Sequence, residues 1–261
     1  MNFRSIAVEC FGPVQRISHN RPEFRNAESR ELLDELDQAI TTAVEDDAVR
    51  VIVLAGKGDH FSAGHDLKEA QRERSGFSVE QRWMYEERRY FDYCLRILNA
   101  PKPIIAQVQG ACIAGGLMVA NMCDIIIASE DAFFADPVVH TLGAAAVEVL
   151  IHPWVLGQRK ARELLYTGGR LSAAEAEKLG MINRVVPREE LEATTLAMAE
   201  KIAEAPPFAL RILKRSLNRT LDAQGFSVAL AAHFDTHQLS HQSEAFQSAR
   251  SVGLDGAIKK S

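Results

Sequence analysis

Residues 49–69 read VRVIVLAGKGDHFSAGHDLKE, and residues 101–116 read PKPIIAQVQGACIAGG. Each stretch contains a continuous run of aliphatic and β-branched residues, Val49–Ala55 in the first and Ile104–Val108 in the second. Such runs are typical of strands that are covered on both faces of a sheet. Each run leads into glycines and other small residues, where the backbone can turn sharply and approach a ligand closely.

The segments around these two stretches predict further strands and helices. Ser5–Val8 and Val14–Ser18 flank a Gly-Pro pair and predict a hairpin. Glu28–Val44 places its apolar residues on one helical face, and Ser78–Leu98 is a long helical pattern. A short helix before a third apolar run, Asp124–Ala128, completes an order of strands and crossovers that predicts parallel pairing in a layered α/β core.

The last third of the chain is helical in pattern. Glu189–Ala205 is amphipathic, and Pro206-Pro207 separates it from a segment that continues to about Arg250. We therefore expect a core over residues 1–205 and a C-terminal helical region over residues 206–261 that takes part in oligomerisation. The apolar positions of this region are more numerous than an exposed tail would retain; they are Leu210, Leu213, Leu217, Phe226, Leu230 and Phe234.

Composition narrows the classes of function. The chain has 261 residues, 47% of them hydrophobic, and a formal net charge of -5 without a block of like charges. This balance argues against nucleic acid as the main partner. The first fourteen residues, MNFRSIAVECFGPV, have no apolar run of the signal-peptide kind, and no window approaches the roughly 20 apolar residues of a membrane span. We expect a cytoplasmic protein without a membrane partner.

The four cysteines carry no metal-binding or redox spacing. Cys10, Cys94, Cys112 and Cys123 form no CxxC pair and have no paired histidine pattern beside them. We expect each to be a buried reduced thiol, and we expect no metal site.

Two strand-to-helix junctions carry the chemistry. They are Phe61–Lys68 (FSAGHDLK) and Gly110–Gly116 (GACIAGG), and a helix N-terminus is predicted after each. Two such turns side by side would aim one backbone N–H each at a single oxygen, as in sites that stabilise a thioester enolate or a tetrahedral adduct. Either turn taken alone is equally compatible with a purely structural role.

Five segments in register resemble the crotonase (enoyl-CoA hydratase/isomerase) superfamily along nearly the whole chain. The resemblance implies a right-handed spiral of ββα turns followed by a C-terminal helical region, and assembly into trimers or dimers of trimers. The segments are NRPEFRNA (20–27), VRVIVLAGKGDHFSAGHDLKE (49–69), PKPIIAQVQGACIAGG (101–116), CDIIIASEDAFFADP (123–137) and RKARELLYTGGRLSAAEAEKLGMINRVVP (159–187).

The resemblance also assigns site residues. The family's two oxyanion donors correspond to the N–H groups of His65 and Gly115. Coenzyme A arrives as part of the substrate, so no separate cofactor is expected. Phe246 resembles an aromatic residue that some members place against a neighbour's coenzyme A, although it also fits an ordinary core position. The residues that match the family's coenzyme A contacts are Arg25, Ala27, Ala63, His65, Asp66, Leu67 and Lys68.

The chain departs from the family's hydratase pattern at both catalytic positions. Hydratases of this family use two glutamates, and the corresponding positions are Met118 and Val138. Neither side chain can move a proton, so the paired carboxylates that activate water and protonate carbon are missing.

The replacement acid–base group is sought between Asp136 and His152, where the family varies its catalytic residues. Glu148 is the first candidate, because it is an isolated acid within the apolar run HTLGAAAVEVLIHPW. Such an acid is either pushed into a pocket, with a raised pKa, or turned out to solvent. His140 and Asp136 are the next candidates, with roles on a loop surface as the alternative, and His152 is expected to be structural.

The leading functional interpretation is an acyl-CoA thioester-processing enzyme of the enoyl-CoA hydratase/isomerase type, which stabilises a thioester enolate in a backbone oxyanion hole. An acyl-CoA decarboxylase or thioester hydrolase is the alternative among enzymes, because it needs fewer acid–base groups. The AGHD sequence at 63–66 occurs in some decarboxylating members and elsewhere in the family, so it does not decide between them. A catalytically silent acyl-CoA-binding protein is the alternative of a different class.

Overall fold

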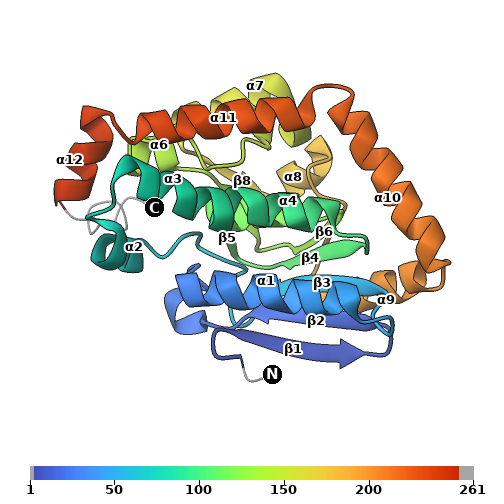
Figure 1. Cartoon of the computed structure of the whole chain (residues 1–261). Helices are drawn as coiled ribbons and strands as arrows, with labels where there is room; N and C mark the ends of the chain where they lie inside the picture. Colours follow the sequence, from blue (N-terminus) through green and yellow to red (C-terminus); the bar gives the residue numbers. More distant parts are fainter. Residues whose placement is uncertain (1–2, 253–261) are drawn as a thin grey trace.

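A six-stranded sheet forms the lower layer of the molecule in Figure 1, a computed structural model that describes residues 3–252. The strand order is β1-β2-β3-β4-β6-β9. The first pair is an antiparallel hairpin and the other pairs are parallel, as the sequence predicted. The strands are β1 (Ile6–Phe11), β2 (Val14–His19), β3 (Val51–Gly56), β4 (Ile104–Val108), β6 (Ile125–Ser129) and β9 (Arg184–Val186).

Both faces of this sheet are covered, which explains the continuous apolar run in β3. Ile52 and Leu54 point into the larger core, whereas Val51 and Val53 pack in a second cluster with helix α9 (Leu191–Ala203). All six residues of β3 are buried. The rigid β3 and β4 therefore fix the positions at which the two glycine-containing turns begin.

Three short strands form a smaller second sheet. Its order is β5-β7-β8, with β5 (Ala111–Ile113), β7 (Phe133–Ala135) and β8 (Arg170–Ser172). The prediction of a turn throughout Gly110–Gly116 is wrong in its middle, because Ala111–Ile113 pairs with β7 in parallel. Small residues suggested a loop, and the partner strand more than twenty residues later imposes an extended backbone instead.

The helix predicted over Ser78–Leu98 is present but is interrupted. It consists of α3 (Val79–Glu86), a π-helical segment η2 (Glu87–Phe91) and α4 (Asp92–Asn99). π-Helical segments often occur at functional sites, and η2 carries the buried Tyr90 that appears below. The other helices before residue 188 are α1 (Arg30–Glu45), α2 (Leu67–Arg74), α5 (Gly115–Asn121), α6 (Val138–Thr141), α7 (His152–Thr167) and α8 (Ala173–Leu179), with a 3-10 turn η1 (Pro22–Phe24).

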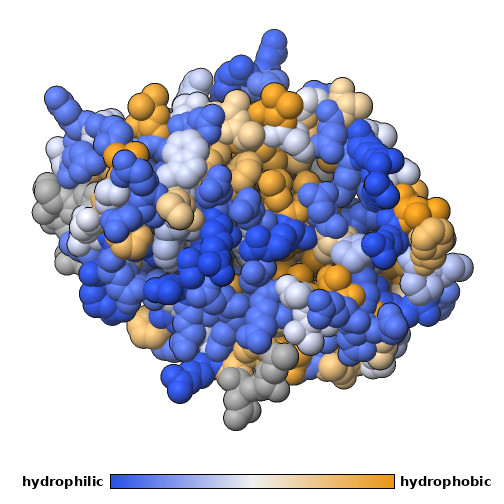
Figure 2. Space-filling model, in the orientation of Figure 1, coloured by the Kyte–Doolittle hydropathy of each residue, from blue (hydrophilic) through white to orange (hydrophobic). Residues whose placement is uncertain are grey.

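Up to residue 252, the C-terminal region contains three helices, α10 (Pro207–Asp222), α11 (Phe226–Ser240) and α12 (Glu244–Val252). A short 3-10 turn, η3 (Arg188–Glu190), precedes α9. Helix α11 runs across the upper layer and α10 stands at the right edge of Figure 1, where apolar side chains also show in Figure 2. The last nine residues of the predicted region, 253–261, lie outside the described residues.

The apolar residues of this region divide between core and surface. Phe226, Leu230 and Phe234 of α11 are buried, whereas Leu213 and Leu217 of α10 are more than half exposed. Helix α11 therefore packs on the core, and α10 keeps apolar side chains uncovered in the single chain.

The four cysteines are all free thiols. Cys94 and Cys112 are buried and Cys123 is partly buried, as expected. The prediction is wrong for Cys10, which is exposed because β1 is the edge strand of the large sheet. Among the described residues, no helix has the length and apolar character needed to span a membrane.

Lys214 anchors α10 to the core through a buried amine. Its Nζ lies 2.7 Å from Asp124 Oδ2 and 3.2 Å from the carbonyl oxygen of Lys102, and the residue is 6% exposed. We expect Lys214→Met to lower the free energy of unfolding by about 1–3 kcal/mol, because it leaves buried acceptors without their donor. Urea unfolding followed by circular dichroism measures this.

The matched control for this substitution is Lys160→Met on α7. Lys160 forms ion pairs with Glu163 and Glu175 at the protein surface, where such pairs contribute little to stability. Equal unfolding midpoints for Lys214→Met and the unmodified protein would show that Lys214 does not anchor α10.

Candidate active site

The turns that follow β3 and β4 lie against each other. Ser62 bridges to the second turn, since its N–H donates to the carbonyl of Ala111 and its carbonyl accepts from Ile113 N–H. A Cβ added to Gly64 would lie 2.7 Å from the Ile113 oxygen and 3.0 Å from Gly115 N. Gly64 also has a φ of +84°, which side chains disfavour. The close contact between the two turns therefore requires glycine at position 64.

Two backbone N–H groups at this contact are left without a partner in their own element. Glu28 pairs with the extended segment around His65 through the N–H groups of Glu28 and Asp66. Because successive N–H groups of an extended segment point in opposite directions, the N–H of His65 points away from Glu28. Gly115 is the first residue of α5, where a helix offers its N–H no internal acceptor.

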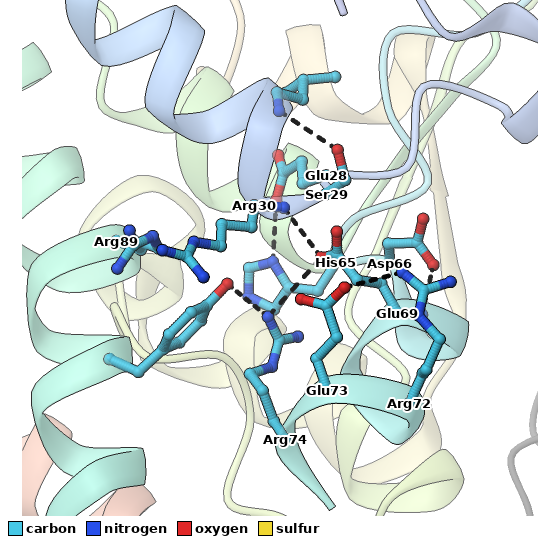
Figure 3. Close-up of polar contacts among 12 residues, drawn as sticks. Glu28, Ser29, Arg30, His65, Asp66, Glu69, Arg72, Glu73, Arg74 and Arg89 are labelled. Atoms are coloured by element: carbon cyan, nitrogen blue, oxygen red, sulfur yellow. Dashed lines mark hydrogen bonds and ion pairs between the residues drawn. The ribbon is translucent and has the colours of Figure 1, made fainter.

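The imidazole of His65 is held between two buried carboxylates. Its Nδ1 lies 2.9 Å from Glu28 Oε2, and its Nε2 lies 3.1 Å from Glu148 Oε2. Figure 3 shows Glu28 and His65 directed toward each other. The ring also stacks on Tyr90, with 3.7 Å between ring centroids and 15° between ring planes.

The charge of the His65 imidazole is set by the carboxylates beside it. Burial alone lowers the pKa of His65, but the negative charge and hydrogen bond of Glu148, followed by those of Glu28, raise it to about 10. His65 is therefore an imidazolium at neutral pH and donates to both carboxylates. Glu28 is completely buried, and no cation of the described residues other than His65 forms an ion pair with its carboxylate.

A cavity of about 720 Å³ opens beside His65 and Glu148. His65, Glu148 and Tyr90 line it, together with Val138 and Phe246. All residues that the resemblance assigned to coenzyme A also line this cavity, namely Arg25, Ala27, Ala63, His65, Asp66, Leu67 and Lys68. Residues that are distant in sequence are thus brought to one site.

Glu148 faces the cavity but differs from both alternatives that the sequence left open. It is 4% exposed, so it is not turned out to solvent. Burial raises its pKa, but the positive charge of His65, with help from His237, lowers the pKa well below its ordinary value. The expected raised pKa is therefore wrong, because the apolar sequence around Glu148 gave no sign of the imidazolium opposite it.

The other candidate residues lie away from the cavity lining. Asp136 is fully buried and accepts hydrogen bonds from the N–H groups of Val138 and Val147. Its Oδ2 lies 3.4 Å from Nε2 of the buried His152, so both residues brace the segment that carries Glu148. His140 is exposed, with Nε2 2.7 Å from the carbonyl oxygen of Tyr166.

The two positions that correspond to hydratase glutamates are apolar and buried. Met118 is 1% exposed within α5, and Val138 is 7% exposed at the start of α6. Only Val138 is among the residues that line the cavity. The carboxylates that line the cavity near His65, such as that of Glu148, therefore come from other parts of the chain.

Sequence reasoning missed Glu28, Tyr90 and a group formed by Glu86, His237 and His241. Glu28 was assigned to the start of a helix, and only its pairing with His65 reveals its role. The spacing of His237 and His241, one helical turn apart, was a usable signal, since residues at i and i+4 share a helix face.

The protonation of His65 is a testable consequence of this geometry. Because its folded pKa of about 10 exceeds the ordinary 6.5, the pairing stabilises the fold fully below pH 6.5 and loses this contribution as the pH rises through 10. We expect the imidazole NMR signals of His65 to remain those of the charged form at pH 8. In Glu148→Gln the pKa should fall. Signals of a neutral ring at pH 7 in the unmodified protein would contradict this electrostatic description.

Comparison with known proteins places the chain in a family. Residues 12–254 match the family model described as enoyl-CoA hydratase/isomerase. A solved structure of a probable enoyl-CoA hydratase from Mycobacterium smegmatis is 52% identical, covers 90% of this chain and 94% of its own, and has a TM-score of 0.86. An enoyl-CoA hydratase/isomerase from Xanthobacter autotrophicus Py2 is 36% identical, covers 99% and 97%, and has a TM-score of 0.92.

A curated relative agrees with these structures. The Mycobacterium tuberculosis protein named "Putative enoyl-CoA hydratase EchA13" is 44% identical over 247 residues, which are 88% of this chain and 78% of the relative. The crotonase fold predicted from sequence is confirmed by these structural likenesses. With a family model that covers most of the chain, the protein belongs to the enoyl-CoA hydratase/isomerase family.

Proposed function

We propose that this enzyme binds an acyl-CoA thioester with the carbonyl oxygen between the N–H groups of His65 and Gly115, and acts through a thioester enolate. The observation that carries the proposal is the contact between the two turns, which leaves both N–H groups unused by their own elements. Donors fixed in advance at the site of developing negative charge are the largest catalytic contribution in many enzymes.

Charge at the cavity suits the coenzyme A part of such a ligand. Arg25 and Lys68 are exposed, line the cavity, and form no ion pair with a carboxylate of the described chain. Cationic side chains of this kind pair with phosphate groups. Apolar lining residues such as Val138, Leu142 and Val147 offer a matching surface for an acyl chain.

Glu148 is the group that we assign to proton transfer. Its carboxylate lines the cavity beside the proposed oxyanion site. Because the ion pair with His65 lowers its pKa, Glu148 has to loosen this contact to accept a proton. In the proposed step, Glu148 accepts the α-proton of the thioester, and the C–H electron pair becomes the enolate whose oxygen the two N–H groups hold. His65 keeps Glu148 oriented through its Nε2 and is treated as a positioning residue.

This assignment favours reactions that need only one proton-transferring group. A single carboxylate can remove a proton from one carbon and return it to another, as in isomerisation. Hydration additionally needs a group that deprotonates water, and Met118 and Val138 supply none. Decarboxylation or hydrolysis of a thioester would use the same oxyanion site, and exchange of the α-proton separates these reactions.

We expect Glu148→Gln to slow α-proton exchange of a saturated acyl-CoA in D₂O by about 10²–10⁴-fold, the usual contribution of a general base. Nuclear magnetic resonance of the ligand measures the exchange. Glu163→Gln on α7 is the matched control, because Glu163 is exposed and lies outside the cavity lining. Asp136→Asn and His140→Ala test the two other sequence candidates in the same assay.

Two results would contradict the assignment. Full exchange activity in Glu148→Gln, with loss in His140→Ala or Asp136→Asn, would transfer the acid–base role to one of those residues. Hydration of crotonyl-CoA as fast as in a member with two glutamates would show that the missing glutamates do not matter. We expect this hydration to be orders of magnitude slower.

We further propose that the chain assembles as a homotrimer or a dimer of trimers. Supporting this, α10 exposes Phe208, Ile212, Leu213 and Leu217 along the edge of the single chain. Exposed apolar patches of this kind often mark contacts between proteins. The cytoplasmic location stays a prediction.

Light scattering at micromolar concentration should therefore report three or six chains per particle. The double variant with Leu213→Glu and Leu217→Glu should shift the particle toward the monomer, because it places charges in an apolar contact. Its far-ultraviolet circular dichroism should be unchanged. A monomeric unmodified protein across the micromolar range would refute the assembly.

A further inference from the structure

A second polar cluster lines the same cavity, away from the two glycine turns. It consists of Glu86 at the end of α3 and of His237 and His241 in α11 and directly after it. The three residues are 6%, 3% and 3% exposed. Each offers one ligand atom, and these atoms lie within 4.8 Å of one another.

The cluster contains buried nitrogen atoms with no partner. Glu86 Oε2 lies 3.7 Å from His237 Nε2 and 3.7 Å from His241 Nδ1, which is too long for a hydrogen bond. Both nitrogens are buried and have no hydrogen-bond partner in the described structure. Because buried polar atoms are nearly always bonded, these nitrogens and the Glu86 oxygen are placed to share one bridging partner.

The spacing matches the coordination shell of a metal ion. Ligands of tetrahedral zinc lie about 2.1 Å from the ion and therefore roughly 3.4 Å from one another. The two distances of 3.7 Å to Glu86 Oε2 are close to this value, and the two histidine nitrogens, within 4.8 Å of each other, would move closer together around an ion. Two imidazoles and one carboxylate form a ligand set that zinc and similar divalent transition metals accept in proteins.

Neighbouring residues hold these side chains in place. Arg82 contacts Oε1 of Glu86 at 3.3 Å, and Gln238 donates to Oε2 at 2.7 Å, so the carboxylate is fixed on both sides. The rings of His237 and His241 lie one helical turn apart, with 4.5 Å between centroids. The contacts of Arg82 and Gln238 with Glu86 are of the kind that orients a metal ligand.

We propose that Glu86, His237 and His241 bind one divalent transition-metal ion of the zinc class, with its remaining coordination position open to the cavity. Bound there, the ion would connect α3 to the C-terminal region and lie near Glu148, whose Oε1 is 3.6 Å from His237 Nε2. The prediction of no metal site was based on the spacing of the cysteines. The ligands proposed here are a glutamate and two histidines from two separate segments of the chain. The inference does not depend on the proposed acyl-CoA chemistry.

The test uses the full-length chain, treated with a chelator and then titrated with Zn²⁺ in a calorimeter without acyl-CoA. We expect binding of one ion per chain and a higher melting temperature with Zn²⁺ present, since a ligand that binds the folded state stabilises it. Co²⁺ should bind at the same site and give visible absorption of a low-symmetry site with nitrogen ligands.

Substitutions locate the ion. Glu86→Gln, His237→Ala and His241→Ala should each weaken affinity by more than the about 10–100-fold that loss of an outer contact causes. His233→Ala is the matched control, because His233 lies one turn earlier on α11 and its Nε2 is already 2.8 Å from the carbonyl oxygen of Val147. It should retain affinity.

Two outcomes would overturn the proposal. One is the absence of stoichiometric Zn²⁺ binding in the unmodified protein at micromolar concentration, which needs no variant to fold. The other is binding that persists in both His237→Ala and His241→Ala, which would place the ion elsewhere. Either outcome leaves the acyl-CoA proposal untouched, because turnover and α-proton exchange are measured separately.

Discussion

The imidazolium of His65 is the interaction on which the site depends. An ionised carboxylate removed from water costs several kcal/mol unless a cation and hydrogen bonds compensate for it. Glu28 and Glu148 are both buried, and each uses one nitrogen of the same ring. One imidazolium thus pairs with carboxyl groups on two segments that lie 120 residues apart (148 minus 28). Loss of His65 would leave two like charges facing each other in a low-dielectric interior.

The same residue connects electrostatics to backbone geometry. Its side chain is fixed by Glu28 and Glu148, while its backbone lies against the turn that contains Gly115. A Cβ on Gly115 would lie 2.3 Å from Glu28 Oε2 and 2.6 Å from the His65 ring, so no larger residue fits without movement. Position 115 therefore needs glycine for the side-chain pair as well as for the turn. The buried pair and the proposed oxyanion donors form one packed unit.

Local patterns in the sequence were sufficient for most of the fold. The apolar runs of β3, β4 and β6 predicted buried parallel strands, because only strands covered on both faces are apolar throughout. The strand β5 was missed, since its three residues, Ala111–Ile113, lie between glycines and become extended only through pairing with β7. Likewise, the π-helical interruption that places Tyr90 under His65 has no signature in the periodicity of Ser78–Leu98.

The turns of the site could be predicted from the sequence. The charge interactions between residues that are distant in the sequence could not. Glycine-containing turns after strands indicated the contact near His65 and Gly115. The lowered pKa of Glu148 could not be inferred, because it depends on His65 and His237 from distant segments. The spacing of His237 and His241 was visible in the sequence, but their proximity to Glu86 was not, because Glu86 lies on α3 and the histidines lie in the C-terminal region.

The central claim is that the N–H groups of His65 and Gly115 share one thioester oxygen. A crystal structure of the protein with a bound, non-hydrolysable acyl-CoA analogue tests it most directly. The account predicts that the carbonyl oxygen lies about 2.7–3.1 Å from both backbone nitrogens, the range of functioning oxyanion donors. A carbonyl oxygen bound elsewhere in the cavity, with either N–H directed at water or protein, would contradict it.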